Sequence, residues 1–339
     1  MRTFALLAAA LTFIGASRLT TPARAQDQVI TGHTNTVKSV AVSPNGRFVV
    51  SGGFDKTVRL WRTGSSMSME RLNEFPEIAL AVAVSPDNHF IATGCADNSV
   101  RICRCLDGMI VRTIGGHTGA VYAVAISPDG QHVASSGIDG VVRLWHMSDG
   151  TRAMTFAGHI APVWAVAFSP DSRYVVSASS DRTVRVWSVM DTLHVRTLEG
   201  HTAPVQDVAI GPVASDGAQY VVTGSVDRTV RVWRLADGEL VRTLTGHGGS
   251  VHTVAISPDG HFVASGSSDG TVRLWNLADG ALVRTYEGHV KGVRDVAFTP
   301  DGHFVVSAGD DKTVRLWDVA DVSALGSGQG RSTSVNQGS

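Results

Sequence analysis

The chain has 339 residues, 43% of them hydrophobic, and its 29 basic and 30 acidic side chains leave a formal net charge of −1. The lysines and arginines are scattered singly rather than clustered, which argues against a nucleic acid or an anionic lipid as the partner. The length alone is typical of two average domains, although a closed array of repeats can hold as many residues in one unit.

The first 25 residues have the three parts of a secretory signal peptide. Arg2 supplies a positive charge, an apolar run covers residues 4–16, and A-R-A at residues 23–25 gives a small-x-small cleavage site. The apolar run is shorter than the roughly 20 residues that a membrane-spanning helix needs, so an uncleaved anchor is the weaker interpretation. We therefore expect a signal peptide at residues 1–25 and a mature chain from Gln26 that is periplasmic or secreted and not inserted in the membrane.

A seven-residue phrase recurs along the rest of the chain. It reads DKTVRLW at residues 55–61, DGVVRLW at 139–145 and DGTVRLW at 269–275, and the copies follow one another with a period of 42 residues. One spacing is longer, because the fifth copy carries GPVASDGAQY where its neighbours have a short turn, so we place this insertion at a turn. The seven copies begin at Asp55, Asp97, Asp139, Asp181, Asp227, Asp269 and Asp311.

Each copy predicts four short strands. Its β-branched runs are bounded by Gly, Pro, Asp and Ser, which is typical of strands and turns, and no segment has helical periodicity long enough to compete. One four-stranded antiparallel sheet cannot bury both of its apolar faces, so neighbouring sheets must stack on it. The prediction is an all-β chain in which seven such sheets close into a ring.

The repeat resembles that of the WD-repeat β-propeller family over nearly all of residues 27–319. Six copies carry a Gly-His pair before the turn aspartate and a tryptophan after it, and every copy has a hydroxyl four residues before the aspartate. We expect Ser51 directly across a hairpin from Trp61, where it can accept from the indole N–H. The resemblance implies that a histidine continues this pair to the aspartate, which gives each blade a polar clasp. The predicted clasp residues are His33, Ser51, Asp55, Trp61, His117, Ser135, Asp139, Trp145, His159, Ser177, Asp181, Trp187, His201, Thr223, Asp227, Trp233, His247, Ser265, Asp269, Trp275, His289, Ser307, Asp311 and Trp317.

The second copy departs from this pattern. Phe75 stands in the position of the histidine and Cys103 in that of the tryptophan, although Thr93 and Asp97 remain. We expect a hydrophobic substitute for the clasp here, and we expect this blade to be the least firmly held of the ring.

The three cysteines, Cys95, Cys103 and Cys105, all fall in this second copy. They are too few for a disulfide framework, and we interpret them first as buried apolar side chains. A strained and labile bridge between Cys103 and Cys105 is the alternative. A metal site is weaker still, because no histidine stands at zinc-finger spacing from them.

The two ends of the chain predict how the ring closes. An outer strand follows every tryptophan of the repeat except Trp317, whereas DQVIT at residues 27–31 precedes the first Gly-His as an outer strand precedes each of the others. We therefore expect the amino-terminal strand to complete the last blade, which removes the open edges of an unclosed array. The propeller then spans residues 26–319, and the Gly/Ser-rich residues 320–339 are expected to form a disordered tail.

No pattern in the sequence points to catalysis. The repeated Ser, His and Asp are already explained as clasps, and a hydrolase needs one exposed nucleophile rather than six buried ones. The sequence has no G-x-S-x-G, Walker, H-E-x-x-H or EF-hand pattern. We expect no catalytic residue, no cofactor and no metal.

Two positions in each copy vary while their neighbours do not, and they resemble the positions that line the top mouth of the channel in WD-repeat propellers. One is the second residue of the inner strand and the other precedes the turn aspartate. Their large aromatic and aliphatic side chains beside charged ones have the composition of a binding hot spot, although they could also merely plug the channel mouth. The predicted partner-binding residues are Lys38, Phe54, Tyr122, Ile138, Trp164, His252, Arg294 and Asp310.

These features predict a rigid, non-enzymatic scaffold in a bacterial cell envelope, monomeric on its own, that binds a protein or a peptide through its top face. One alternative is a lactonase-like hydrolase with its site in the channel, for which only Asp207, Asp295 and His252 lie near the channel strands. Another is a structural part of an envelope assembly that uses the sides of the blades.

Overall fold

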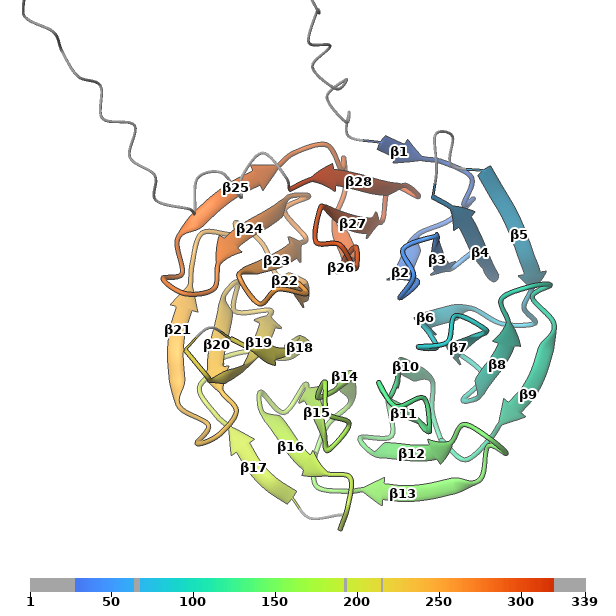
Figure 1. Cartoon of the computed structure of the whole chain (residues 1–339), viewed down its shortest axis with the longest axis horizontal. Coiled ribbons are helices and arrows are strands. Elements are labelled where there is room, and N and C mark those ends of the chain that lie inside the picture. Colours follow the sequence, from blue (N-terminus) through green and yellow to red (C-terminus); the bar gives the residue numbers. More distant parts are fainter. Residues whose placement is uncertain (1–27, 64–67, 192–193, 215, 320–339) are drawn as a thin grey trace, which may run out of the picture.

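Seven four-stranded antiparallel sheets stand in a ring in the part of the chain that the structure describes (Figure 1). The structure is a computed structural model that describes residues 28–63, 68–191, 194–214 and 216–319, with the backbone alone for residues 68–73. The predicted signal peptide and the predicted tail lie outside these residues. The ring itself confirms the all-β propeller with seven blades.

Each blade runs from the channel to the rim of the ring, and we number the blades 1 to 7 from the one that contains residue 37. The inner strands are β2 (Val37–Val42), β6 (Ala79–Val84), β10 (Val121–Ile126), β14 (Val163–Phe168), β18 (Val205–Val213), β22 (Val251–Ile256) and β26 (Val293–Phe298). The second strands are β3 (Phe48–Gly53), β7 (Phe90–Cys95), β11 (His132–Gly137), β15 (Tyr174–Ser179), β19 (Gln219–Ser225), β23 (Phe262–Ser267) and β27 (Phe304–Gly309). The third strands are β4 (Thr57–Arg62), β8 (Val100–Arg104), β12 (Val142–His146), β16 (Val184–Ser188), β20 (Val230–Arg234), β24 (Val272–Asn276) and β28 (Val314–Asp318). The outer strands are β5 (Ser68–Glu74), β9 (Ile110–Ile114), β13 (Arg152–Phe156), β17 (His194–Leu198), β21 (Leu240–Leu244), β25 (Leu282–Tyr286) and β1 (Gln28–Ile30).

The amino-terminal strand closes the ring. β1 pairs antiparallel with β28, so the last sheet has the order β1-β28-β27-β26, and Ile30 lies opposite Val314. The two strands lie side by side although they come from opposite ends of the chain (Figure 1). The predicted closure is therefore confirmed.

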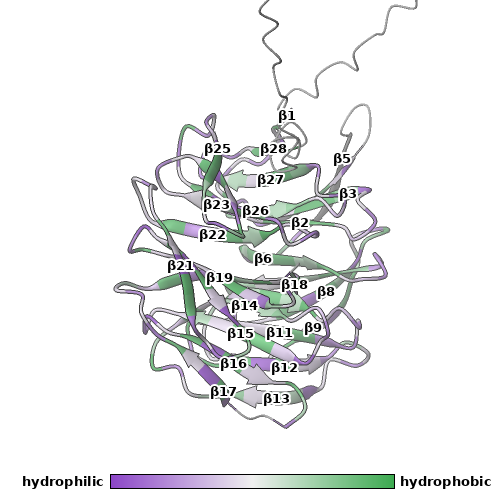
Figure 2. Ribbon diagram, turned by 60° about the vertical axis from the view of Figure 1, so that its left-hand side comes forward, coloured by the Kyte–Doolittle hydropathy of each residue, from purple (hydrophilic) through white to green (hydrophobic). Residues whose placement is uncertain are grey.

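The hydrophobic core lies between neighbouring blades. In one apolar cluster, Val176 and Val186 of blade 4 pack with Val221 and Trp233 of blade 5, and all four are almost fully buried. Figure 2 shows hydrophobic residues along the strands and many hydrophilic ones in the loops at the edges of the ring. Each sheet thus buries both faces only because it has a neighbour on either side.

Each inner strand has a β-bulge directly after its first residue. In β10 the pairing jumps from Val121 to Ala123, which leaves Tyr122 without a partner on β11, and the other six inner strands show the same shift. A bulge re-aims its extra residue, and here the extra side chain points into the channel. These seven bulge residues are Lys38, Leu80, Tyr122, Trp164, Gln206, His252 and Arg294.

Six blades hold the clasp with nearly the same geometry. In blade 1 the indole N–H of Trp61 donates to Ser51 at 2.8 Å, Oγ of Ser51 lies 2.7 Å from Nε2 of His33, and Nδ1 of His33 lies 2.8 Å from Asp55. The corresponding distances in the other five blades are 2.7–3.1 Å. A neutral histidine with its proton on Nδ1 satisfies each donor in this chain of hydrogen bonds.

The register of the clasp hairpin differs from the prediction. Ser51 is paired with Arg59, and the residue opposite Trp61 is Val49. Ser51 and Trp61 are diagonal neighbours, and the large indole spans the extra distance. The predicted hydrogen bond therefore forms, but the prediction that the two residues lie directly opposite each other is wrong.

Blade 2 replaces the clasp by apolar packing. Phe75 and Cys103 are both buried and belong to one hydrophobic cluster. Asp97 accepts hydrogen bonds from Arg101 instead of from a histidine. Oγ1 of Thr93, with its usual partners missing, is buried and has no hydrogen-bond partner.

The three cysteines of blade 2 are free and buried. Burial raises the pKa of Cys103 and of Cys105 to about 12, which keeps both as neutral thiols. The interpretation of the cysteines as buried apolar side chains is confirmed, and the alternative bridge between Cys103 and Cys105 is not formed.

Candidate functional site

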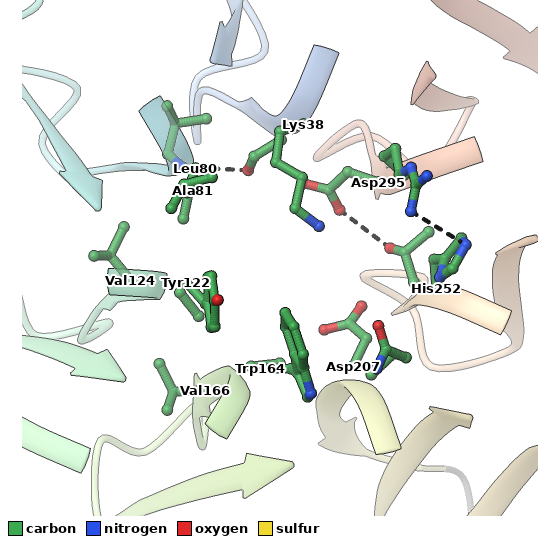
Figure 3. A pocket seen from close by; sticks show the side chains of 17 residues that line it. Lys38, Leu80, Ala81, Tyr122, Val124, Trp164, Val166, Asp207, His252 and Asp295 are labelled. Atoms are coloured by element: carbon green, nitrogen blue, oxygen red, sulfur yellow. Dashed lines mark hydrogen bonds between the residues drawn. The ribbon is translucent and has the colours of Figure 1, made fainter. Parts of the chain in front are cut away.

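A cavity of about 140 Å³ lies in the channel and is lined by the seven bulge residues (Figure 3). A second ring of side chains, one residue further along each inner strand, also lines it. The members of this second ring are Ser39, Ala81, Ala123, Ala165, Asp207, Thr253 and Asp295.

One wall of the cavity is aromatic. The rings of Tyr122 and Trp164 are stacked with their centroids 4.4 Å apart and an interplanar angle of 15°. The indole N–H of Trp164 donates to Oγ of Ser180 at 2.6 Å, which fixes the ring at the edge of the cavity. Leu80 extends the same wall and is itself buried. The wall offers a flat apolar face with few degrees of freedom to lose on binding.

The opposite wall is polar and internally paired. Arg294 donates to both carboxylate oxygens of Asp310 at 2.6–2.9 Å, and its Nη1 lies 3.3 Å from Nε2 of His252. Burial, together with the positive charges of Arg294 and Lys38, lowers the pKa of His252 to about 4. His252 is therefore neutral at pH 7, and Asp310 neutralises Arg294.

Lys38 points into the cavity without a partner (Figure 3). Its ammonium group makes no ion pair or hydrogen bond with the residues that the structure describes. Burial and the nearby charge of Arg294 lower the pKa of Lys38. The ammonium group is thus held in the channel with unused donors.

Two carboxylates of the second ring cap main-chain N–H groups. Asp295 accepts from the N–H of Val40 at 2.8 Å, and Asp207 accepts from the N–H of Val254 at 2.8 Å. Burial raises the pKa of Asp295, and burial together with repulsion from Asp295 raises that of Asp207 to about 7. Both residues were expected near the channel from the sequence, but their role as acceptors for main-chain N–H groups was not predicted. The signal for this role was the recurrence of Ser, Thr, Asp or Ala at this position in the seven copies.

The structure brings five of the eight predicted rim residues together around the cavity and leaves three outside its lining. Phe54 and Ile138 do not line it and are 40% and 48% exposed, respectively. Asp310 joins the site through Arg294. The five that line the cavity are Lys38, Tyr122, Trp164, His252 and Arg294, and Leu80 and Gln206 line it as well.

Within the residues that the structure describes, no group of three or more His, Cys, Asp or Glu side chains could hold a metal ion. The same residues contain no helix that is both long and apolar enough to cross a membrane.

Comparison with known proteins extends this picture. The family model described as "WD domain, G-beta repeat" matches seven segments of the chain, at residues 25–62, 76–103, 108–146, 150–188, 193–234, 238–276 and 280–318. The nuclear distribution protein PAC1 of Candida dubliniensis is 43% identical over 42 residues, which are 12% of this chain and 9% of that protein. Its namesake in Meyerozyma guilliermondii is 39% identical over 49 residues, 14% of this chain and 10% of that protein. The matches thus cover about a tenth of the length of these relatives.

Proposed function

Because this chain belongs to the WD domain, G-beta repeat family, we propose that it is a non-enzymatic scaffold that binds a protein or peptide partner at the mouth of its channel. A propeller of this family suggests a protein-interaction scaffold, and the choice of face is our proposal. The match to the nuclear distribution proteins is too short to indicate a partner.

The observation that supports this face is the stacked pair Tyr122 and Trp164 across the cavity from the ion pair of Arg294 and Asp310. Aromatic side chains bury a large area at low cost in conformational entropy, and they dominate many protein interfaces. A charged pair on the opposite wall can fix the orientation of a partner through charge-assisted hydrogen bonds. The partner then anchors on the aromatic wall and is oriented by the polar one.

We further propose that the protein acts in a bacterial cell envelope as a monomer. The first 25 residues support export, because they combine a positive start, an apolar run and a small-x-small cleavage site. Edman sequencing of the exported protein is expected to begin at Gln26.

The test of the scaffold is affinity capture with crosslinking from an envelope extract. Tyr122→Ala combined with Trp164→Ala is expected to abolish capture and to leave the melting temperature nearly unchanged, because neither side chain belongs to the clusters between the blades. The control is Leu106→Ala with Met190→Ala. These two residues are 85% and 81% exposed. They follow the ends of β8 and β16, on the face of the ring opposite the channel mouth. Undiminished capture by the rim variant would show that the partner binds elsewhere.

A further inference from the structure

The cavity contains hydrogen-bond donors that the rest of the protein leaves unused. Each inner strand turns one N–H into the channel two residues after its bulge, and in most blades a side chain accepts it. The N–H of Val40 goes to Asp295 at 2.8 Å, and that of Val82 goes to Ser39 at 3.2 Å. Val254 and Val296 likewise donate to the second-ring residue of the preceding blade, Asp207 and Thr253 respectively. Val208 donates instead to Asp207 of its own strand.

Blades 3 and 4 break this rule. The acceptor position one blade back is occupied by Ala81 for the N–H of Val124 and by Ala123 for the N–H of Val166, and a methyl group cannot accept. Both valines line the cavity beside Tyr122 and Trp164 (Figure 3). The two alanines therefore leave space and, next to it, two donors without a side-chain acceptor.

The side chains above this space add further unused polar groups. Among the described residues, the ammonium of Lys38, the hydroxyl of Tyr122 and the amide of Gln206 make no hydrogen bond, although all three line the cavity. The carboxylates of Asp207 and Asp295 accept from main-chain N–H groups, and each keeps lone pairs for a further donor. These three side chains are half-buried, and with the N–H groups of Val124 and Val166 they give the cavity more free donors than free acceptors, so an acceptor oxygen on a ligand would complement it.

The charges around the cavity favour a neutral ligand. Arg294 is neutralised by Asp310, and His252 is uncharged at neutral pH. Lys38 lies close enough to Asp207 and Asp295 to interact with their charges, and burial raises the pKa of both carboxyls. Lys38 and the two acidic side chains line the same cavity, so an added anion would be repelled by the carboxyls and an added cation by Lys38.

The size of the cavity limits the ligand to one side chain. A cavity of about 150 Å³ is known to hold a benzene ring, which has six heavy atoms. The volume of about 140 Å³ here therefore suits a group of about five or six heavy atoms, and it is too small for a helix or a loop.

We propose that this cavity receives a neutral carboxamide, namely the side chain of an asparagine or a glutamine that the partner inserts into the channel. Its carbonyl oxygen accepts from the N–H groups of Val124 and Val166 and from Lys38. Its NH₂ group donates to Asp207 and Asp295, which lie across the cavity from the two valines (Figure 3). A carboxamide is the one side-chain group that is neutral and has both an acceptor and two donors. This inference rests on the proposed function, because it names what the channel mouth recognises.

The first experiment is an NMR titration of the mature full-length chain that follows the indole N–H of Trp164. Its probes are propanamide, propanoate and butylammonium, which have the same number of heavy atoms but differ in charge. Propanamide is expected to produce a saturable shift with a millimolar Kd, and the two ions are expected to bind at least 10-fold more weakly. Equal or tighter binding of either ion would overturn the proposal.

The second experiment supplies the missing acceptors from within the protein. Ala81→Ser with Ala123→Ser places in blades 2 and 3 the hydroxyl that blades 1 and 6 already use, and is expected to weaken propanamide binding at least 10-fold. The matched control is Ala165→Ser, because the N–H that it faces, that of Val208, is already accepted by Asp207. This control is expected to bind within 2-fold of the unaltered chain, and equal binding by the double variant would overturn the proposal. If the double variant does not fold, Lys38→Met takes its place and is expected to weaken the binding of propanamide severalfold. Unchanged binding by this variant would also overturn the proposal.

A third experiment separates a partner's side chain from a free small amide. The probes are the capped pentapeptides GGQGG, GGEGG and GGLGG, of which the glutamine peptide is expected to bind at least 10-fold more tightly than the others. If propanamide binds but the glutamine peptide does not exceed the leucine peptide, a free amide is the ligand and the assignment to a partner is wrong. These results do not depend on the capture experiment. If the rim variant loses capture but no amide binds, the carboxamide proposal is overturned and the proposed scaffold function stands.

Discussion

Each hydroxyl in the six clasps is fully buried and has two hydrogen-bond partners, the indole N–H of the tryptophan and Nε2 of the histidine. Loss of this one oxygen atom therefore leaves two other buried groups unpaired. In blade 5, Thr223 accepts from Trp233 and lies 2.7 Å from Nε2 of His201, whereas Thr93 in blade 2 has no partner at all. Thr223→Val is therefore expected to lower the free energy of unfolding by about 1–3 kcal/mol, because it leaves two buried groups unpaired. Thr93→Val is expected to leave that free energy unchanged or to raise it. Urea unfolding of the two variants makes the comparison, and an equal loss in both would show that the hydrogen bonds do not stabilise the blades.

The clasp carboxylates make the fold sensitive to acid. Burial alone would raise the pKa of Asp227, but hydrogen bonds from His201 and Thr229 lower it well below its usual range, and the corresponding bonds do the same for Asp55, Asp181 and Asp311. A carboxyl whose pKa is lower in the folded than in the unfolded chain stabilises the fold fully above the unfolded value, about 3.9, and loses this contribution as the pH falls toward the folded value. The free energy of unfolding is therefore expected to fall steeply below about pH 4 in a urea series from pH 7 to pH 3. A curve that stays flat to pH 3 would contradict this account.

Among the elements, blade 2 has a natural pair of probes for its own stability. All three cysteines lie in this blade, and none of the seven tryptophans does. Labelling of the thiols therefore reports the opening of blade 2, whereas tryptophan fluorescence reports the other blades. Because apolar packing around Phe75 replaces the clasp, we expect the thiols to be unreactive without denaturant and to become labelled at a lower urea concentration than that of the fluorescence transition. Coincident transitions would show that blade 2 is held as firmly as its neighbours.

The sequence predicted the strands better than the contacts between them. The recurring turn residues and the 42-residue period are local signals, and they located four strands in every copy. The placement of Ser51 opposite Trp61 failed because hairpin register depends on the loop, and a diagonal pair also satisfies the hydroxyl. The bulge after the first residue of each inner strand has no strong local signal, yet it sends Tyr122 and Trp164 into one cavity. Phe54 and Ile138 precede their turns as expected, but side-chain direction at a loop could not be read from the sequence, and they lie outside the lining.

At the scale of the whole molecule, closure was predictable because it is a matter of counting strands. The chain has one outer strand too few at its end and one too many at its start, and the only arrangement without an open edge joins them. The function of the second ring was not predictable in this way. Asp295 of the last blade caps the N–H of Val40 in the first, a contact between residues 255 positions apart that exists only once the ring is closed.

The short strand that closes the ring gives the last prediction. Ile30 is 8% exposed and packs between β28 and blade 1, whereas its neighbour Val29 is 49% exposed. Ile30→Ala is expected to lower the free energy of unfolding by about 2–5 kcal/mol, since a core residue is truncated at the joint that holds the ends together. Val29→Ala removes a similar group from the solvent side of the same strand and is expected to change it by less than about 1 kcal/mol. When β1 detaches, the edge of β28 is free to pair with another chain, so Ile30→Ala should also form dimers or larger species by light scattering near its melting temperature. If both variants unfold alike and remain monomeric, the three-residue strand does not hold the ring closed.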